Sequence, residues 1–193
     1  MKTVQVTPAQ MEARIARFRA AKPQSGYYAD SGIPKEAYEL MTAKTLYLMM
    51  APPTQGGPMA AKPVIEGAKG MSLIIAECPP GDRPLLHAHF RTSETFMVLK
   101  GRFRIRWGDH GEHEVHLDPF DVIAVPPGVC RDFTNVTDET AQLLAIITGQ
   151  SDQDFNDIAI APDDAKMMLD RFGPDVIKKI EATGVQFMTS TAD

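Results

Sequence analysis

The chain has 193 residues, of which 44% are hydrophobic and 23% are charged, and its formal net charge is -5. These values predict a soluble globular protein with one main domain and some added segments. The acidic balance argues against a nucleic-acid partner, because nucleic-acid binders present a basic surface. No window approaches the roughly 18 apolar residues of a membrane span, and the first ten residues lack the apolar core of a secretory signal. We therefore expect a cytoplasmic protein without a membrane partner.

The first 45 residues are expected to form a helical arm. The run Thr-Pro-Ala-Gln from Thr7 supplies an N-cap, a proline at the first helical position and a glutamine in a capping box. Met11, Ile15 and Phe18 then recur at helical spacing. This spacing predicts a helix whose apolar stripe docks on the rest of the protein.

Residues 46–150 read as a β-barrel. A loop rich in proline and glycine at 51–63 follows a first predicted strand at 45–50. Short apolar runs that end in proline, glycine or aspartate then predict strands at 71–78, 95–100, 102–107, 114–117, 121–125 and 141–148. Strands this short at nearly regular spacing favour an antiparallel sandwich or barrel.

Residues 151–193 are expected to be helical and to pack outside the barrel. Pro162 and Pro174 each stand at the start of an amphipathic run, and Gly173 separates the two runs. Proline is favoured at the first position of a helix, and glycine is favoured just beyond its end. The sequence therefore predicts two consecutive helices after the barrel.

The segment from Gly81 to Gly101 contains the strongest chemical signal. His87 and His89 are two residues apart, so in an extended strand their side chains leave the same face. Glu94 follows after a polar link that is long enough for the chain to turn back. Two neutral imidazoles and one carboxylate are the ligand set of the facial triad in non-haem iron sites.

This segment resembles the first motif of the cupin superfamily, G-x5-H-x-H-x4-E-x6-G, at every interval, with Gly81, His87, His89, Glu94 and Gly101 in place. The second motif, G-x5-P-x-G-x2-H-x3-N, matches only in part. Pro126, Gly128 and Asn135 are present, whereas Phe120 replaces the glycine and Arg131 replaces the histidine. The resemblance covers residues 70–150 and implies a mainly β protein, an antiparallel jelly-roll barrel. It implies a divalent metal held by His87, His89 and Glu94, without the family's fourth ligand.

Arg131 leaves three alternatives, because a guanidinium has no lone pair with which to bind a metal. It can turn aside from a metal that keeps open positions. It can contact an anionic substrate bound at that metal, since its fork suits a carboxylate. It can also replace the metal and pair with Glu94 in a metal-free barrel.

Other residues are interpreted as structural. His110 and His113 are expected in a solvated hairpin, and His116 is a weaker candidate for a fourth ligand. Cys130 stands beside Arg131, which would favour a thiolate, but a small buried hydrophobe is the commoner role. Two further expectations concern the barrel: Asn135 as a strand-end or turn residue, and Phe96 and Val98 as lining of the pocket through their alternation with Glu94.

The resemblance favours a small-molecule cupin enzyme, with a metal-dependent dioxygenase acting on a small, acidic organic substrate as the leading reaction class. Fe(II) is the favoured metal, with Mn, Ni and Zn as alternatives, and Arg131 would orient the substrate. A lyase or isomerase on the same fold is an alternative, because fold alone does not set chemistry. A non-catalytic cupin that senses a small anionic ligand without metal is another. Exposed strand edges predict a homodimer.

Overall fold

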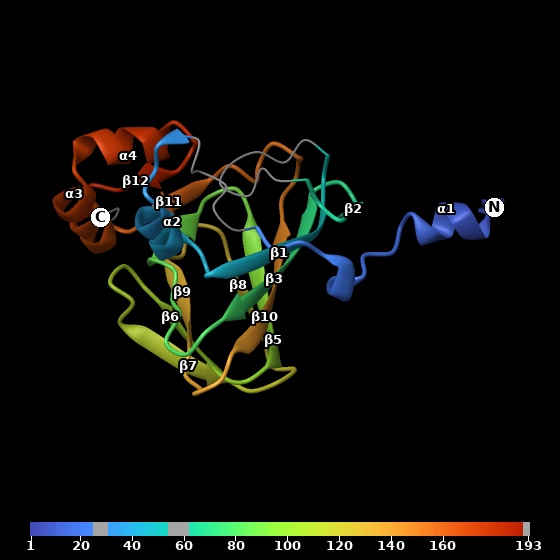
Figure 1. The fold of residues 1–193 in the computed structure, drawn as a ribbon, viewed down its shortest axis with the longest axis horizontal. Coiled ribbons are helices and arrows are strands. Elements are labelled where there is room, and N and C mark those ends of the chain that lie inside the picture. Colours follow the sequence, from blue (N-terminus) through green and yellow to red (C-terminus); the bar gives the residue numbers. More distant parts are fainter. Residues whose placement is uncertain (25–30, 54–61, 191–193) are drawn as a thin grey trace.

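The computed structural model describes residues 1–24, 31–53 and 62–190, and Figure 1 shows its fold. Two six-stranded sheets, formed by the described residues, face each other in a jelly-roll barrel. The first sheet has the order β2-β1-β3-β10-β5-β8 and the second the order β12-β11-β4-β9-β6-β7. Neighbouring strands are antiparallel except for β1 with β2 and β11 with β12. The mainly β fold predicted from the sequence is confirmed.

The strands of the first sheet are β1 (Thr45–Ala51), β2 (Ile65–Glu66), β3 (Met71–Cys78), β5 (Ser93–Lys100), β8 (Val122–Val125) and β10 (Ala141–Thr148). The second sheet contains β4 (His87–His89), β6 (Phe103–Trp107), β7 (His113–Leu117), β9 (Arg131–Asn135), β11 (Ile158–Ile160) and β12 (Gln186–Phe187). Residues alternate between buried and half-buried along β3, β5 and β10. This alternation places one face of each strand in the barrel core.

The barrel core lies between the two sheets. Its buried side chains are mainly aliphatic and aromatic, and they include Phe96, Val98, Phe103, Ile105 and Leu143, each with no exposed surface. The ring of Phe133 contacts the rings of Phe96 and Phe103 edge to face, with centroids 5.4 and 6.0 Å apart. These apolar contacts form the core of the barrel.

Three helices and the second sheet enclose a separate hydrophobic cluster. The helices are α2 (Lys35–Met41), α3 (Pro162–Phe172) and α4 (Pro174–Glu181), and they group on one side of the barrel (Figure 1). Met168 and Ile180 are fully buried there against Ile160. The two predicted C-terminal helices are confirmed, including their proline starts and the Gly173 break.

The C-terminal segment also contributes two strands that the sequence did not predict. β11 pairs antiparallel with β4 and joins Ile158 to His89 and Ile160 to His87 in the ladder. β12 pairs with the far side of β11. Both strands are only two or three residues long, so they offer too few positions for an alternation pattern. The segment therefore extends the sheet that carries the histidines.

The N-terminal arm differs from the expected docked helix. The capping box of Thr7 and Gln10 forms, but α1 (Pro8–Glu12) ends after five residues and has no buried residue. Met11 and Ile15 remain 50% and 42% exposed. The arm extends away from the side of the barrel that carries α3 and α4 (Figure 1). In the short 3-10 helix η1 (Phe18–Ala20) the arm packs on the barrel, and the centroid of the Phe18 ring lies 4.8 Å from that of Tyr47.

The fold does not test the expected cellular location or the expected homodimer. None of the helices in the described ranges is long and apolar enough to cross a membrane. The cytoplasmic location and the homodimer stay predictions. The proline- and glycine-rich loop predicted at 51–63 lies mostly in residues 54–61, outside the described residues.

Phe120 combines a bulky side chain with a backbone conformation that suits glycine. Its φ is 73°, and in the described part of the chain it is the only non-glycine residue with a positive φ. The side chain is 75% exposed, so it contributes little packing. The turn is held by the Phe120 amide, which donates to the Val98 carbonyl at 2.8 Å. The position that the family motif gives to glycine thus keeps glycine geometry without glycine.

We expect Phe120→Gly to raise the free energy of unfolding by about 0.5–1 kcal/mol. The left-handed conformation costs a side chain about 1–2 kcal/mol, and the greater freedom of glycine in the unfolded chain offsets part of that gain. Urea unfolding of the two proteins measures the difference. Phe120→Ala is the control, because alanine removes the ring and keeps the strain; an equal gain in both variants would contradict a backbone cause.

Candidate metal centre

Three buried side chains from two sheets form the candidate metal centre. The ligand atoms of His87, His89 and Glu94 all lie within 4.8 Å of one another, and this is the group of metal-ligating residues found in the described chain. β4 supplies both histidines from the second sheet, and β5 supplies Glu94 from the first. The sequence interpretation that brings these three residues together agrees with this geometry.

The local backbone explains why both imidazoles point inward. His87 and His89 are two apart in an extended strand, so they share the inner face. His87 is paired with Arg131 across the β4–β9 ladder, which places the guanidinium beside it on the same face. Glu94 lies in the first sheet, opposite the histidines. Its strand neighbours there are Ile147 and Val125, and both of these residues are buried in the barrel.

Hydrogen bonds place a proton on Nδ1 of both histidines. His87 Nδ1 lies 2.7 Å from the Leu85 carbonyl oxygen, and because a carbonyl can only accept, Nδ1 carries the proton. His89 Nδ1 lies 2.8 Å from Asp157 Oδ1 and donates to that carboxylate. Burial, followed by the Arg131 charge, lowers the pKa of His87 to about 3, so its ring is neutral at physiological pH. In a neutral ring of this tautomer, Nε2 carries the lone pair that a metal requires.

Arg131 forms an ion pair with the third residue of the group. Its Nη2 and Nε donate to Glu94 Oε2 at 2.7 and 3.0 Å, and its Nη1 donates to the His87 carbonyl at 3.3 Å. The Arg131 side chain is only 1% exposed. The pairing of Arg131 with Glu94 is therefore part of this geometry, and the three alternatives for Arg131 toward a metal stay predictions.

The ion pair carries a desolvation cost. Burial raises the pKa of Glu94, with the Asp157 carboxylate as a second cause, and burial lowers the pKa of Arg131. Both directions reflect the loss of water around a charge. The short contact between guanidinium and carboxylate offsets this loss, and a guanidinium does not give up its proton in proteins. We therefore assign the pair as ionised.

The donor set fits a divalent metal. Two imidazoles whose Nδ1 protons are bound elsewhere and one carboxylate converge from two sides of the barrel, and in their neutral form both rings offer the Nε2 lone pair that a facial triad requires. His89 Nε2 and Glu94 Oε2 are 3.9 Å apart, so a small inward shift of the side chains would bring both to ligand distance. His87, His89 and Glu94 can hold a metal, and Arg131 competes with that metal for Glu94.

A small apolar cavity adjoins the three residues. Its volume is about 80 Å³, and its polar side chains include His87, His89 and Glu94. The apolar part of its wall is formed by Leu46, Ile74, Phe133, Leu143 and Ile147, with Ile158 from the C-terminal segment. Phe96 and Val98 were expected to line this pocket, but they lie in the fully buried core and are not among its lining residues.

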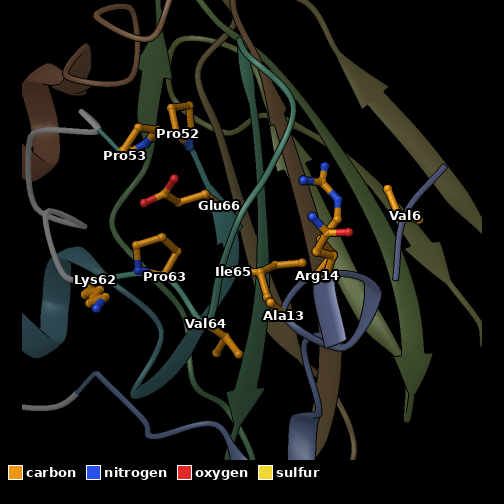
Figure 2. Close-up of a pocket in the computed structure, with 11 residues that line it drawn as sticks. Val6, Ala13, Arg14, Pro52, Pro53, Lys62, Pro63, Val64, Ile65 and Glu66 are labelled. Atoms are coloured by element: carbon orange, nitrogen blue, oxygen red, sulfur yellow. The ribbon is translucent and has the colours of Figure 1, made fainter. Parts of the chain in front are cut away.

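A larger surface groove lies elsewhere and lacks this chemistry. It has a volume of about 920 Å³ and lies between the N-terminal arm and the start and end of the β1–β2 connection (Figure 2). Among its described lining residues, Arg14, Lys62 and Glu66 are charged and none is a histidine or cysteine. Figure 2 shows Pro52, Pro53 and Pro63 on its wall. This groove therefore combines a larger volume with side chains that do not form a metal-ligating group.

The remaining candidates occupy structural positions. His116 is exposed on β7, which excludes it as a fourth ligand in this fold, and His110 and His113 are also exposed. Burial, followed by the Asp109 and Glu112 carboxylates, raises the pKa of the Cys130 thiol to about 11, opposite to the activation considered from its neighbour Arg131. Asn135 is a strand-end residue, as expected, and its amide nitrogen donates to the Cys78 and Glu139 carbonyls.

Asp157 was missed by the sequence reasoning. It lies 63 positions after Glu94 in the printed sequence and carries no motif. It reaches the site only because β11 pairs with β4 and places Ile158 opposite His89. No local pattern in the sequence indicates that Asp157 lies near the histidines, because the contact depends on a strand of only three residues.

Comparison with known proteins places the barrel in a family. Residues 74–147 match the family described as the cupin domain. The chain therefore contains a cupin domain, and the resemblance to the cupin superfamily seen in the two motifs is confirmed. No curated protein matches the chain.

Solved structures show partial similarity to the chain. One of them is a Silicibacter pomeroyi protein described as a sugar phosphate isomerase from a cupin superfamily. It is 27% identical, with a TM-score of 0.39, and the match covers 42% of this chain and 52% of the isomerase chain. A protein of Bacillus halodurans is 14% identical, with a TM-score of 0.42 over 45% and 68% of the two chains. The cupin domain of Cnp3 from Schizosaccharomyces pombe is 14% identical, with a TM-score of 0.39 over 54% and 65%. At this level, the similarity carries no conclusion about activity.

Proposed function

We propose that this protein is a small-molecule cupin enzyme, a metal-dependent oxidoreductase of the dioxygenase type. The observation that supports it best is the tautomer of the two histidines. Because Leu85 and Asp157 accept from Nδ1 of His87 and His89, Nε2 of each ring is left on the inner face near Glu94 and carries a lone pair when the ring is neutral. A histidine that serves only as a buried polar residue has no need of a free lone pair beside a carboxylate.

Fe(II) is the metal we favour, with Mn, Ni or Zn as alternatives for the same donors. Two histidines and one carboxylate on one face are the ligand set of non-haem Fe(II) oxygenases. When bound, such a metal supplies a Lewis acid with open coordination positions and redox chemistry.

The protein's own residues would bind and orient the substrate. A cavity of about 80 Å³ accommodates a small molecule or the end of a larger one, since pockets for drug-sized ligands reach roughly 300–1,000 Å³. Its largely apolar wall favours a hydrocarbon body and excludes water from the site.

Arg131 supports an acidic substrate. If Glu94 turns its oxygen toward a metal, the guanidinium loses its partner and remains buried with an uncompensated charge. A buried charge requires a partner, and a carboxylate on the substrate would provide one with bidentate geometry. In this scheme Arg131 orients the substrate by its acidic group.

Metal analysis tests this proposal. We expect the protein purified without chelator, or reconstituted with Fe(II), to hold about one divalent ion per chain, and His87→Ala to lose at least about tenfold in affinity. His116→Ala is the matched control, because His116 is an exposed histidine of the same barrel. Less than about 0.1 ion per chain, with no uptake on reconstitution, would exclude the enzyme scheme.

A second function is favoured by the ion pair itself. A non-catalytic cupin could use Arg131, His87 and His89 to bind a small anion without metal, since the guanidinium already lies at the inner face. Calorimetric titration with a small carboxylate, acetate or benzoate, in the presence of chelator tests it. Binding that Arg131→Met abolishes would support the second function, and an absence of heat would reject it.

A further inference from the structure

Asp157 is a buried carboxylate that accepts four hydrogen bonds, all from residues 89–92, the segment between the candidate ligands His89 and Glu94. It is 6% exposed. Its Oδ1 accepts from His89 Nδ1 at 2.8 Å and from Thr92 Oγ1 at 3.2 Å. Its Oδ2 accepts from the backbone amides of Arg91 and Thr92 at 2.6 and 3.1 Å. Both oxygens are therefore fixed, and the carboxylate cannot rotate away from the imidazole.

We propose that Asp157 is a positioning residue for His89, so that the C-terminal segment completes the metal centre of the barrel. The claim about metal affinity rests on the proposed function, whereas the claim about the imidazole does not. Asp157 stands directly before β11, the strand that pairs with β4. The barrel thus supplies the ligand, and a segment outside it supplies the group that orients the ligand.

The physical reason is the asymmetry of a neutral imidazole. A proton on Nδ1 leaves the lone pair on Nε2, and a proton on Nε2 removes that lone pair. The Asp157 carboxylate holds the proton on Nδ1 and increases the electron density that His89 offers to a cation. Such partners of ligating histidines contribute about 10–100-fold to metal affinity.

The same bonds couple the site to the C-terminal segment. Asp157 connects this segment to the turn after β4, and the next residue, Ile158, lines the cavity beside His89. A metal that prefers the docked segment must in turn stabilise its docking, because coupling between two binding events is reciprocal. We therefore expect metal to slow amide exchange in β11 and α3.

Asp157→Asn tests the positioning role with little change in shape. Long-range 1H–15N correlation spectra of the imidazole rings, recorded without metal, report the tautomer of His89 directly. We expect the Nδ1–H form in the wild type and loss of that uniform tautomer in the variant. Titration with Co(II) as the probe is expected to show about a 10–100-fold loss of affinity.

Two control variants separate positioning from docking of the segment. Asp152→Asn removes another carboxylate of the same segment, whose Oδ1 accepts from the Gly70 amide at 3.0 Å, a bond that involves neither histidine. Thr92→Val removes one donor to Asp157 and keeps the bond to His89. Both are expected to retain the His89 tautomer and the Co(II) affinity.

Two results would overturn the proposal. One is an Nε2–H tautomer of His89 in the wild type, a measurement that needs no variant to fold. The other is an unchanged tautomer in Asp157→Asn. If the wild type binds no metal but the tautomer depends on Asp157, the proposed function fails and the positioning role stands.

Discussion

Replacing Arg131 with methionine is expected to lower the free energy of unfolding by about 3–5 kcal/mol in the presence of chelator, because breaking a buried ion pair leaves one charge without compensation. The charge left without a partner is the Glu94 carboxylate. Glu94 is 7% exposed, and its Oε2 accepts hydrogen bonds from Arg131 at 2.7 and 3.0 Å. Methionine fills much of the same volume, so cavity formation adds little. Urea unfolding monitored by circular dichroism measures the change.

A double variant and a surface control check the cause. Arg131→Met with Glu94→Leu removes both charges, and it is expected to restore stability to within about 1 kcal/mol of the wild type, because an apolar pair of similar volume often replaces a buried ion pair without loss. Arg102→Met breaks an exposed pair with Asp118, whose atoms are 3.4 Å apart, and should cost at most about 0.5 kcal/mol. A double variant as unstable as Arg131→Met would show that lost packing, rather than unpaired charge, is the cause.

Arg131→His is expected to increase divalent-metal affinity at least about 100-fold. A guanidinium about 5 Å from a divalent ion would repel it by roughly 7 kcal/mol at an effective dielectric near 20. Relief of even about 3 kcal/mol of this repulsion corresponds to roughly a 100-fold gain in affinity. The substitution also adds a fourth donor, because position 131 is directly opposite His87 in the β4–β9 ladder. Isothermal titration with Zn(II) or Co(II) measures the gain.

Arg131→Gln separates the two contributions. Glutamine removes the charge and supplies no imidazole, so a gain shared by both variants is due to lost repulsion, and a gain confined to Arg131→His is due to the new ligand. Unchanged affinity in both variants would mean that Arg131 turns away from the metal in the wild-type protein and does not oppose it.

Most of the barrel was predictable because its signals are local. The strands β3, β5 and β10 alternate along their own length, and each ends at turn residues that are adjacent in the chain. The convergence of His87 and His89 on one face followed from the period of two in a strand. The C-terminal helices followed from Pro162 and Pro174 at their starts.

The parts that were not predicted depend on contacts between distant segments. The arm carries an apolar pattern at Met11 and Ile15, but no surface in the described chain covers these residues. The spacing of apolar residues along a helix indicates which side can be buried, but it does not indicate whether a partner surface is available. The strand β11 and its neighbour Asp157 were missed for the same reason.

The amino-acid sequence alone determined the fold class and three candidate ligands, because alternation and motif spacing are properties of neighbouring residues. Only the tertiary structure revealed the contact between Arg131 and Glu94, since this pairing joins strands from opposite sheets. The tertiary structure also revealed the hydrogen bond between His89 and Asp157, a contact created when the C-terminal segment adds a strand beside β4. The charge and hydrogen-bond partners of a buried site are set by which chain segments meet there, and the sequence does not encode that meeting in any local pattern.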